Sequence, residues 1–596
     1  MITKKITKEP VIFLFKKSWK YSKGKRSILV LFMVLHILAN LALLLEPYIV
    51  GLFLNELQSN GLSNQNVRYI SSLLLGILGV TALFWSLHGP ARVIGRNHAF
   101  YVRKKYKEDL LKGVLDLDLT WHADRESGNT IDKVNKGSEA LFRFTGGIFL
   151  VMQVITTLIS TIIVIFFFSV PVALIVMVLT ILSLSIIFQF DKKLVPQYAD
   201  LAVLDNKISG KVFDGLSNIT SITILRIKNV ILKGMMMAIE KPWDLYTKNN
   251  VLNEKKWAAC SLLVRLTVVI PMILYIFYLL QGNEVIVIGS ITALYLYIDR
   301  MSDTFFTFTY TYEDLIRYKI DIENTETIEK DFIIDKKSKT EYRQYDQIAF
   351  ENVSFNYFTE QKESKRADIS IDAITFNKGE RVAVIGESGA GKTTFLKIIH
   401  GLYSEAESEI IVDKKKVEGS FGSVDLGTML VPQEPEIFSS SIRENITFGM
   451  DYSDEEVMRF AKMAQFDFVI DDLPKGLDSV VNEKGVNLSG GQKQRLALTR
   501  ALIFAQDKDL ILLDESTSSV DPHNEVLIYK QVFESFRDKT IIASIHKLNL
   551  LKQFDRILIF EKGSVADDGS FEELLERNRS FSKMWDEYRS EHKERK

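Results

Sequence analysis

The sequence predicts a membrane domain of six α-helices followed by a soluble α/β nucleotide-binding domain. Three observations support this fold class. Apolar blocks of about the length needed to cross a bilayer fill residues 28–308 and are absent beyond them. From residue 348 onward, short β-rich runs alternate with helical patterns. The first buried run of that second half leads into a glycine-rich loop of the phosphate-binding kind.

The membrane domain is predicted from six apolar blocks. A helix needs about 20 predominantly apolar residues to cross the hydrocarbon core. Two of the blocks exceed that length without a charge, which argues against buried helices of a soluble core. The third and fourth blocks are separated only at Val170-Pro171, which predicts a tight outer turn. The predicted spans are 28–50, 70–90, 146–168, 172–190, 258–280 and 285–308.

The distribution of Lys and Arg predicts the orientation of these spans. Nine basic residues precede the first span, and eleven lie in each of the long connections 91–145 and 191–257. The connection 51–69 has only Arg68, and the third and fifth connections have no basic residue. Because basic loops stay on the cytoplasmic side, we expect a multi-pass cell-membrane protein with both termini inside. The long connections are expected to continue the helices into the cytosol and to turn near 119–130 and 213–221.

Composition excludes several classes of protein. The 74 Lys and Arg nearly balance the 75 Asp and Glu, so a nucleic-acid partner held by bulk charge is not expected. Cys260 is the only cysteine, which excludes an internal disulfide framework and a cysteine-based metal cluster.

The charged stretch 321–347 follows the last span and predicts a linker. The expected domains are therefore a transmembrane domain over 1–320, this linker, and a nucleotide-binding domain over 348–590.

The glycine-rich loop has the pattern G-x-x-x-x-G-K-[ST] between a predicted strand, 381–386, and a predicted helix. Its glycines allow backbone N–H groups to face phosphates, and the helix N-terminus adds partial positive charge. Lys392 is expected to reach the β- and γ-phosphates, and the Thr393 hydroxyl to bind Mg²⁺. The loop residues expected to contact the nucleotide are Gly386, Glu387, Ser388, Gly389, Ala390, Gly391, Lys392, Thr393 and Thr394.

A second buried run, 510–513, ends in Asp514 and Glu515. Ligands of open α/β sheets bind at the carboxyl ends of the strands, where these two carboxylates are expected to lie. Asp514 suits support of Mg²⁺, and Glu515 suits a base that orients the attacking water.

The run LSGGQ at 488–492 resembles the signature of the ATP-binding cassette (ABC) transporters. Tyr357 resembles the aromatic residue that stacks on adenine, Gln433 the Q-loop glutamine and a Mg²⁺ ligand, and His546 the switch histidine. Ser519-Val520-Asp521 resembles the D-loop. The resemblance implies ATP and Mg²⁺ as cofactors, catalysis by Glu515, His546 and Lys392, and an exporter-type half-transporter. It also adds signature residues to the nucleotide contacts: Ser489, Gly490, Gly491 and Gln492.

The resemblance implies ATP-hydrolysis-driven export or flipping of an amphipathic small molecule, lipid or peptide by alternating access. The partner is expected to be a second half-transporter; a homodimer is simpler and a heterodimer stays open. An ATP-gated channel or regulator and a fused importer are the alternatives. Three positions depart from the family pattern: NEKG at 482–485, Val520 for the more usual Leu, and Lys547 for the commoner Arg.

Charged residues within the predicted spans are candidates for cargo contact. They are Glu46 before Pro47, Arg265 in the fifth span, and Asp299 and Arg300 in the sixth. The alternative is that Arg265 reaches the inner boundary of the bilayer and that Asp299 and Arg300 pair with neighbouring helices. Since no acidic stripe, Met cluster or Cys/His set is present, a metal ion is not expected as cargo.

Overall fold

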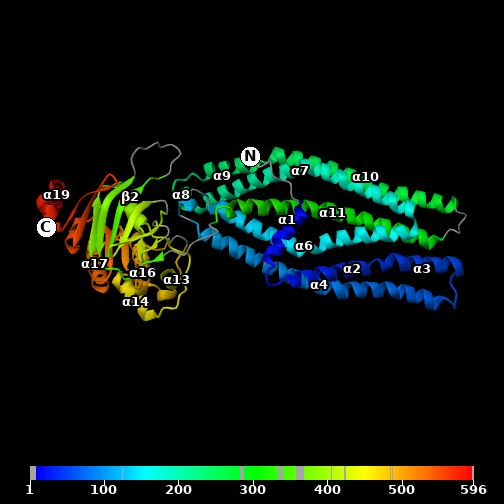
Figure 1. Ribbon diagram of the computed structural model, residues 1–596, viewed down its shortest axis with the longest axis horizontal. Coiled ribbons are helices and arrows are strands. Elements are labelled where there is room, and N and C mark those ends of the chain that lie inside the picture. Colours follow the sequence, from blue (N-terminus) through cyan, green and yellow to red (C-terminus); the bar gives the residue numbers. More distant parts are fainter. Residues whose placement is uncertain are drawn as a thin grey trace. The chain divides into compact units, whose positions relative to one another are not determined.

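The computed structural model divides into two compact units near residue 333, and each is described by itself. The structure describes residues 9–117, 119–123, 125, 127–281, 287–332, 340–357, 368–403, 406–419, 421, 424–482, 485 and 487–593. Figure 1 shows long, nearly parallel helices in the first unit and a mixed α/β arrangement in the second.

The described part of the first unit consists of helices and their connections. The helices are α1 (Pro10–Tyr21), α2 (Arg26–Ala42), α3 (Leu45–Asn60), α4 (Val67–Leu115), α5 (Leu119–Ala123), α6 (Ser127–Phe168), α7 (Val170–Ser217), α8 (Ile219–Ile224), α9 (Lys228–Glu240), α10 (Trp243–Gln281) and α11 (Ile288–Glu329). The longest, α4, has 49 residues and therefore extends over roughly 73 Å at 1.5 Å per residue. Such lengths exceed the hydrocarbon thickness, as the long predicted connections require.

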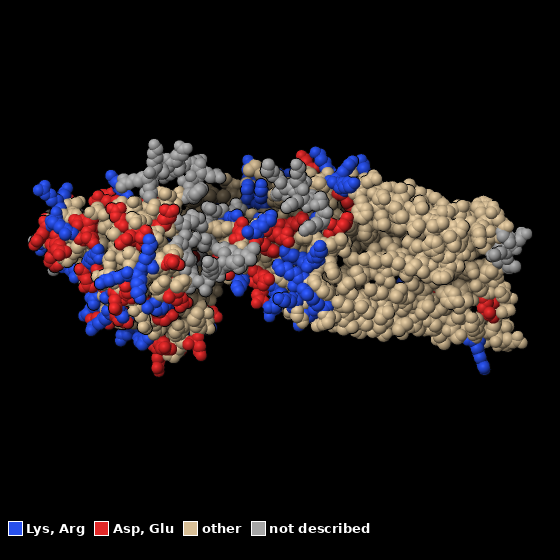
Figure 2. Space-filling model, viewed as in Figure 1, with Lys and Arg blue, Asp and Glu red and all other residues tan. Residues whose placement is uncertain are grey.

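Five helical segments of the described residues are long and apolar enough to cross a membrane, judged by length and composition alone. They are Arg26–Asn60, Val67–Leu115, Ser127–Phe168, Val170–Ser217 and Lys228–Gln281. The sixth predicted span lies in α11, whose apolar run is interrupted by Asp299, Arg300 and Asp303. α11 packs against α6, α3 and α10, and Asp299 and Arg300 have partners on neighbouring elements. Figure 2 shows the surface of these helices almost free of charge over the half farther from α1.

The first predicted span, 28–50, lies within the spanning segment Arg26–Asn60, and the structure interrupts its helix at Leu43 and Leu44, between α2 and α3. Pro47 explains the break: it lacks an N–H, and its ring crowds the carbonyl four residues earlier, that of Leu43. Side chains of α11 satisfy the freed carbonyls. Arg300 Nη1 donates to Leu43 O at 2.8 Å, and Tyr297 Oη donates to Leu44 O at 2.7 Å.

α3 and α11 also meet at their backbones. A Cβ added to Gly289 would lie 2.0 Å from Gly51 O, so only glycine fits at this crossing. Small residues allow such close approach between membrane helices. Farther along, the Ile288 backbone N–H donates to Gln58 Oε1 at 2.7 Å. α11 therefore holds α3 through Ile288 and Gly289, and holds the break before α3 through Tyr297 and Arg300.

The predicted turns lie close to their expected places. α6 ends at Phe168 and α7 begins at Val170, as the Val170-Pro171 pair predicts. Short helices α5 and α8 lie within or at the ends of 119–130 and 213–221. The predicted linker differs, because α11 continues to Glu329 and a short strand begins at Thr340. Of the predicted fifth connection, 282–284 lie outside the described residues.

The second unit contains the strands β1 (Thr340–Glu341), β2 (Gln347–Phe355), β3 (Ile369–Asn377), β4 (Arg381–Gly386), β5 (Glu407–Val412), β6 (Lys415–Val417), β7 (Val424–Asp425), β8 (Thr428–Val431), β9 (Leu510–Asp514), β10 (Thr540–Ser544), β11 (Arg556–Glu561) and β12 (Ser564–Gly569). Its α-helices are α12 (Lys392–Ile399), α13 (Ile442–Thr447), α14 (Asp454–Met463), α15 (Asp467–Asp472), α16 (Gly490–Phe504), α17 (Pro522–Ser535), α18 (Phe571–Arg577) and α19 (Arg579–Lys593). Two short 3₁₀ segments cover Gly476–Asp478 and Leu548–Gln553.

A six-stranded sheet in the order β12-β11-β4-β10-β9-β8 forms the centre of this unit. β11, β4, β10, β9 and β8 are parallel, and β12 is antiparallel to β11. β9 and β10 are buried at every position, as expected for strands covered on both faces. A second, antiparallel sheet has the order β3-β2-β5-β6. Because β4 and β9 are parallel, the loops that follow them emerge at the same edge.

Candidate nucleotide-binding site

The glycine-rich loop joins β4 to α12, as the sequence predicts. Gly386 ends the strand with φ +155°, and a Cβ there would lie 2.4 Å from Phe560 O. Gly391 caps α12 with φ +103°, and a Cβ there would lie 2.6 Å from Ile369 Cδ1. Both glycines are therefore required by the backbone path and by their close neighbours. The result is a loop whose N–H groups lead into the N-terminus of an eight-residue helix.

Lys392 lies buried beneath this loop, with 5% of its surface exposed. Its Nζ donates to Gly386 O at 2.8 Å and to Glu387 O at 3.2 Å, so it is held against the loop by backbone carbonyls. Burial lowers the pKa of Lys392, and the nearby carboxylates of Glu515 and Asp514 oppose that effect. A phosphate oxygen is a strong competing partner for the same ammonium, which suits the expected role of this lysine.

Thr393 and Asp514 meet across the ends of two strands. Thr393 Oγ1 donates to Asp514 Oδ1 at 2.9 Å, and Asp514 is 1% exposed. Burial raises the pKa of the Asp514 carboxyl, and the hydrogen bond from Thr393 partly opposes this. Hydroxyl, amide and carboxylate oxygens are the donors that Mg²⁺ prefers. Thr393 and Asp514 therefore bring two donors that fit this ion side by side, and Gln433 carries a further side-chain oxygen beside Glu515.

Glu515 lies between Gln433 and His546. Gln433 Nε2 donates to Glu515 Oε2 at 2.6 Å, and His546 Nε2 contacts Glu515 Oε1. Glu515 has φ +45°, a left-handed conformation that few side chains adopt, directly after the buried β9. Backbone strain of this kind often accompanies a side chain that must be aimed precisely. The three residues come from segments far apart in the chain, and the structure places them together.

Gln494, on α16, is a residue beside the site that sequence reasoning missed. It is buried, its Nε2 donates to Ser518 Oγ at 2.8 Å, and its Oε1 accepts from the Ser519 N–H at 2.7 Å. A longer contact of 3.4 Å joins Nε2 to Gln433 O. Gln494 therefore links the start of the D-loop to the backbone that carries Gln433. The sequence signal was a single glutamine inside an amphipathic helix, which does not by itself indicate such a role.

Lys547, a departure from the family pattern, has a clear structural role. Its Nζ donates to Val520 O at 2.9 Å and forms an ion pair of 3.0 Å with Glu525. Glu525 also accepts from Thr517 Oγ1 at 2.7 Å. Lys547, directly after His546, thus holds the segment Ser519-Val520-Asp521 from one side.

Tyr357 is 47% exposed, as an aromatic platform for a base must be. Its Oη is 2.9 Å from Thr394 Oγ1 and 3.2 Å from the Oη of Tyr403, and the two tyrosine rings meet edge to face. Phe355 contacts both rings. Tyr403, which sequence reasoning did not select, therefore fixes the orientation of Tyr357 beside the phosphate loop.

The signature residues occupy the start of α16. Ser489 caps this helix: its Oγ accepts from the Gln492 N–H at 3.2 Å, and Gln492 Oε1 accepts from the Ser489 N–H at 2.8 Å. A Cβ added to Gly491 would lie 2.7 Å from Ser519 O, which explains the glycine. In the described part of the cassette, no hydrogen bond joins these residues to the phosphate loop. Ser489 and Gly490 are exposed at the start of α16.

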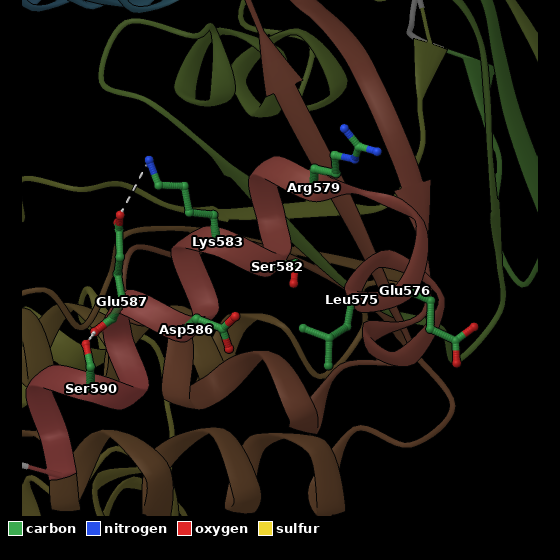
Figure 3. A pocket seen from close by; sticks show the side chains of 8 residues that line it. All are labelled: Leu575, Glu576, Arg579, Ser582, Lys583, Asp586, Glu587 and Ser590. Atoms are coloured by element: carbon green, nitrogen blue, oxygen red, sulfur yellow. Dashed lines mark hydrogen bonds and ion pairs between the residues drawn. The ribbon is translucent and has the colours of Figure 1, made fainter.

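The cavity on α18 and α19 contains none of the residues above. It encloses about 560 Å³ and is shallow. Figure 3 shows its lining side chains, among which Lys583 and Glu587 form an ion pair. Both of these side chains are mostly exposed, so the cavity is an ordinary feature of a charged surface.

The fold and this site define a class: a membrane protein with a P-loop nucleotide-binding domain. Comparison with known proteins agrees. Residues 29–303 match the family ABC transporter transmembrane region, and residues 370–518 match the family ABC transporter. The chain belongs to the ABC transporters, and its fold is that of an exporter-type half-transporter.

Three similar proteins indicate how far this likeness extends. A solved structure described as a bacterial Atm1-family ABC exporter with ATP bound has a TM-score of 0.82 and 21% identity, over 95% of this chain and 98% of that chain. The uncharacterized ABC transporter ATP-binding protein YknU of Bacillus subtilis is 26% identical over 81% of this chain and 82% of its own length. The mitochondrial iron-sulfur clusters transporter ATM1 of Candida glabrata is 35% identical over 40% of this chain and 33% of its own length. The match to that transporter and to its Aspergillus fumigatus counterpart thus spans about a third of each relative.

Proposed function

We propose that this chain is one half of an ATP-hydrolysis-driven exporter or flippase. It acts as a dimer, in the cell membrane, on an amphipathic small molecule, lipid or peptide. The observation that carries the proposal is the arrangement around Glu515. A carboxylate positioned by Gln433 and His546, beside Lys392 and the Thr393–Asp514 pair, provides the groups that hydrolysis of a nucleoside triphosphate needs, and the same chain carries membrane helices.

The chemistry follows from these side chains. Lys392 and the loop N–H groups bind the phosphates, and Mg²⁺, held by Thr393, Asp514 and Gln433, would neutralise their negative charge. Glu515 accepts the proton of the attacking water and orients it, with Gln433 and His546 fixing the carboxylate. Tyr357 stacks on the base. The exposed signature residues of a second chain close over the nucleotide, so that ATP favours the closed dimer.

Export is tested by ATP-dependent uptake into inside-out vesicles that contain the purified chain. The substrates are a panel of fluorescent amphipathic compounds, labelled lipids and short peptides. Because curated relatives are named for iron–sulfur clusters and for heavy-metal tolerance, the panel includes a heavy-metal thiolate complex. We expect uptake of at least one compound by the wild type. Uptake of none, with ATP hydrolysis intact, would refute export.

The matched variants are Glu515→Gln and Glu534→Gln. Both remove one carboxylate from the cassette, but Glu534 is exposed on α17, away from the groups named above. Loss of a general base costs about 10²- to 10⁴-fold in rate. We expect Glu515→Gln to bind ATP and to lose hydrolysis and uptake by that factor, while Glu534→Gln behaves as the wild type. Normal hydrolysis by Glu515→Gln would show that Glu515 is not the base.

A further inference from the structure

A cluster of exposed cations lies immediately before the first membrane span. It consists of Lys16, Lys20, Lys23, Lys25 and Arg26, which we call the basic collar. The sequence contains no Asp or Glu between Glu9 and Glu46. Within the described ranges, no member of the collar forms an ion pair with a carboxylate. Among the residues that the structure describes, the collar therefore presents five positive charges without a carboxylate partner.

The collar is held in place by aromatic side chains. The Arg26 guanidinium lies 4.9 Å from the centre of the Trp19 ring, and Arg26 Nε donates to Trp19 O at 3.4 Å. Lys25 Nζ lies 4.5 Å from the centre of the Tyr101 ring, whose Oη donates to Lys23 O at 3.1 Å. These contacts restrict the cations to one surface before any partner arrives.

Lys17, on the same helix as Lys16 and Lys20, differs from the collar because carboxylates neutralise its charge. Lys17 is buried, and its Nζ donates to Glu326 at 2.9 Å and to both oxygens of Glu329 at 2.9–3.0 Å. Tyr106 Oη also donates to Glu329, at 2.7 Å. Lys17 thus fastens α1 to the end of α11. The exposed lysines on the same helix are not needed for that attachment.

The position of the collar indicates its partner. The first apolar segment begins at Arg26, so the collar lies where the apolar surface starts. Figure 2 shows Lys and Arg side chains gathered next to the uncharged surface, over the region of α1 and the start of α2 in Figure 1. Phe15 and Trp19 stack at 6.1 Å, and Ile12 is 55% exposed on the same helix. Aromatic residues beside cations are typical of the membrane interface.

We propose that the basic collar binds the headgroups of anionic phospholipids in the cytoplasmic leaflet. Four to eight Lys or Arg immediately cytoplasmic of a membrane helix attract negatively charged lipid, each by about fivefold in affinity. Bound headgroups supply the negative charge that the collar lacks. The proposal is independent of which cargo is transported.

The test measures the association of spin-labelled phosphatidylglycerol and phosphatidylcholine with the purified full chain in bilayers of phosphatidylcholine. We expect the wild type to prefer phosphatidylglycerol, and the preference to fall as salt rises. The main variant changes Lys16, Lys20, Lys23 and Lys25 to Gln, and we expect its preference to fall at least fivefold. Changing the same four residues to Arg is expected to preserve it.

A second control changes Lys228, Lys233, Lys241 and Lys248 to Gln. These four lysines are equally exposed but lie on or beside α9 and α10. We expect this variant to keep the wild-type preference. The proposal is wrong if the wild type shows no preference, if the collar Gln variant retains it, or if the control loses as much. Should the fourfold Gln variant not assemble, the single variants Lys16→Gln and Lys20→Gln take its place.

Discussion

Lys256 offers the sharpest test of how the helical unit is stabilised. Its side chain is 0% exposed and lies between two carboxylates, with Nζ 3.2 Å from Asp191 Oδ1 and 2.5 Å from Glu313 Oε1. The carboxylates are 5% and 12% exposed and come from α7 and α11, while Lys256 lies on α10. Lys256→Met keeps the length of the side chain but leaves two buried negative charges without a cation. Breaking a buried ion pair in this way costs about 3–5 kcal/mol.

The loss is measured by equilibrium unfolding in mixed micelles, and two further variants identify its cause. Lys136→Met removes a cation that pairs with Asp132 and Asp205 but is 31% exposed, so we expect a change of about 0–1 kcal/mol. The triple variant Asp191→Asn, Lys256→Met, Glu313→Gln removes all three charges and is expected to recover most of the stability. A change below about 1 kcal/mol for Lys256→Met would refute the reasoning. A triple variant no more stable than the single one would do the same.

Three other predictions concern single sites. Asp514→Asn is expected to stabilise the protein without nucleotide at pH 7 while abolishing Mg²⁺-dependent hydrolysis. Burial raises the pKa of Asp514 in the folded protein, so the folded state favours the neutral carboxyl and is destabilised when that carboxyl ionises. The increase in the free energy of unfolding should therefore vanish below the ordinary pKa of 3.8. No increase at pH 7 would contradict the prediction. Arg300→Met removes the charged donor of the Leu43 carbonyl, leaves it only the long bond of 3.4 Å from the Glu46 N–H, and is expected to cost about 1–3 kcal/mol in the same unfolding assay. Arg265→Met, at a side chain 69% exposed, should cost about 0–1 kcal/mol. Tyr357→Ala is expected to weaken ATP binding in calorimetry by about 1–3 kcal/mol, and Tyr357→Phe to keep most of the affinity; equal losses would mean that the hydroxyl, not the ring, binds the base.

Much of the nucleotide site was predictable because its residues are adjacent in sequence or follow buried strands. The phosphate loop requires glycines at fixed spacing, so its pattern alone identifies Lys392 and Thr393. Asp514 and Glu515 follow a run of four apolar residues, which indicates a strand end. Gln433 and His546 carry no such local pattern, and family resemblance was needed to select them.

What sequence reasoning missed depends on contacts between distant segments. Gln494 and Tyr403 act through hydrogen bonds to residues far along the chain, which no periodicity indicates. In the helical unit, length and hydropathy located the apolar blocks but not the break at Pro47. The charged residues selected as cargo candidates illustrate the same point. Arg300 donates to a freed carbonyl, and Asp299 lies 3.6 Å from Arg265.

The joining of α3 to α11 has a mechanical consequence. Sliding one helix along the other would drive the Gly51 and Gly289 backbones into bulkier neighbours. Pulling them apart would strand the carbonyls of Leu43 and Leu44 in hydrocarbon, where water offers no replacement. α3 and the adjoining part of α11 therefore have to move together as one rigid body. Any opening toward the far side of the bilayer must pivot elsewhere, between helices that lack these contacts.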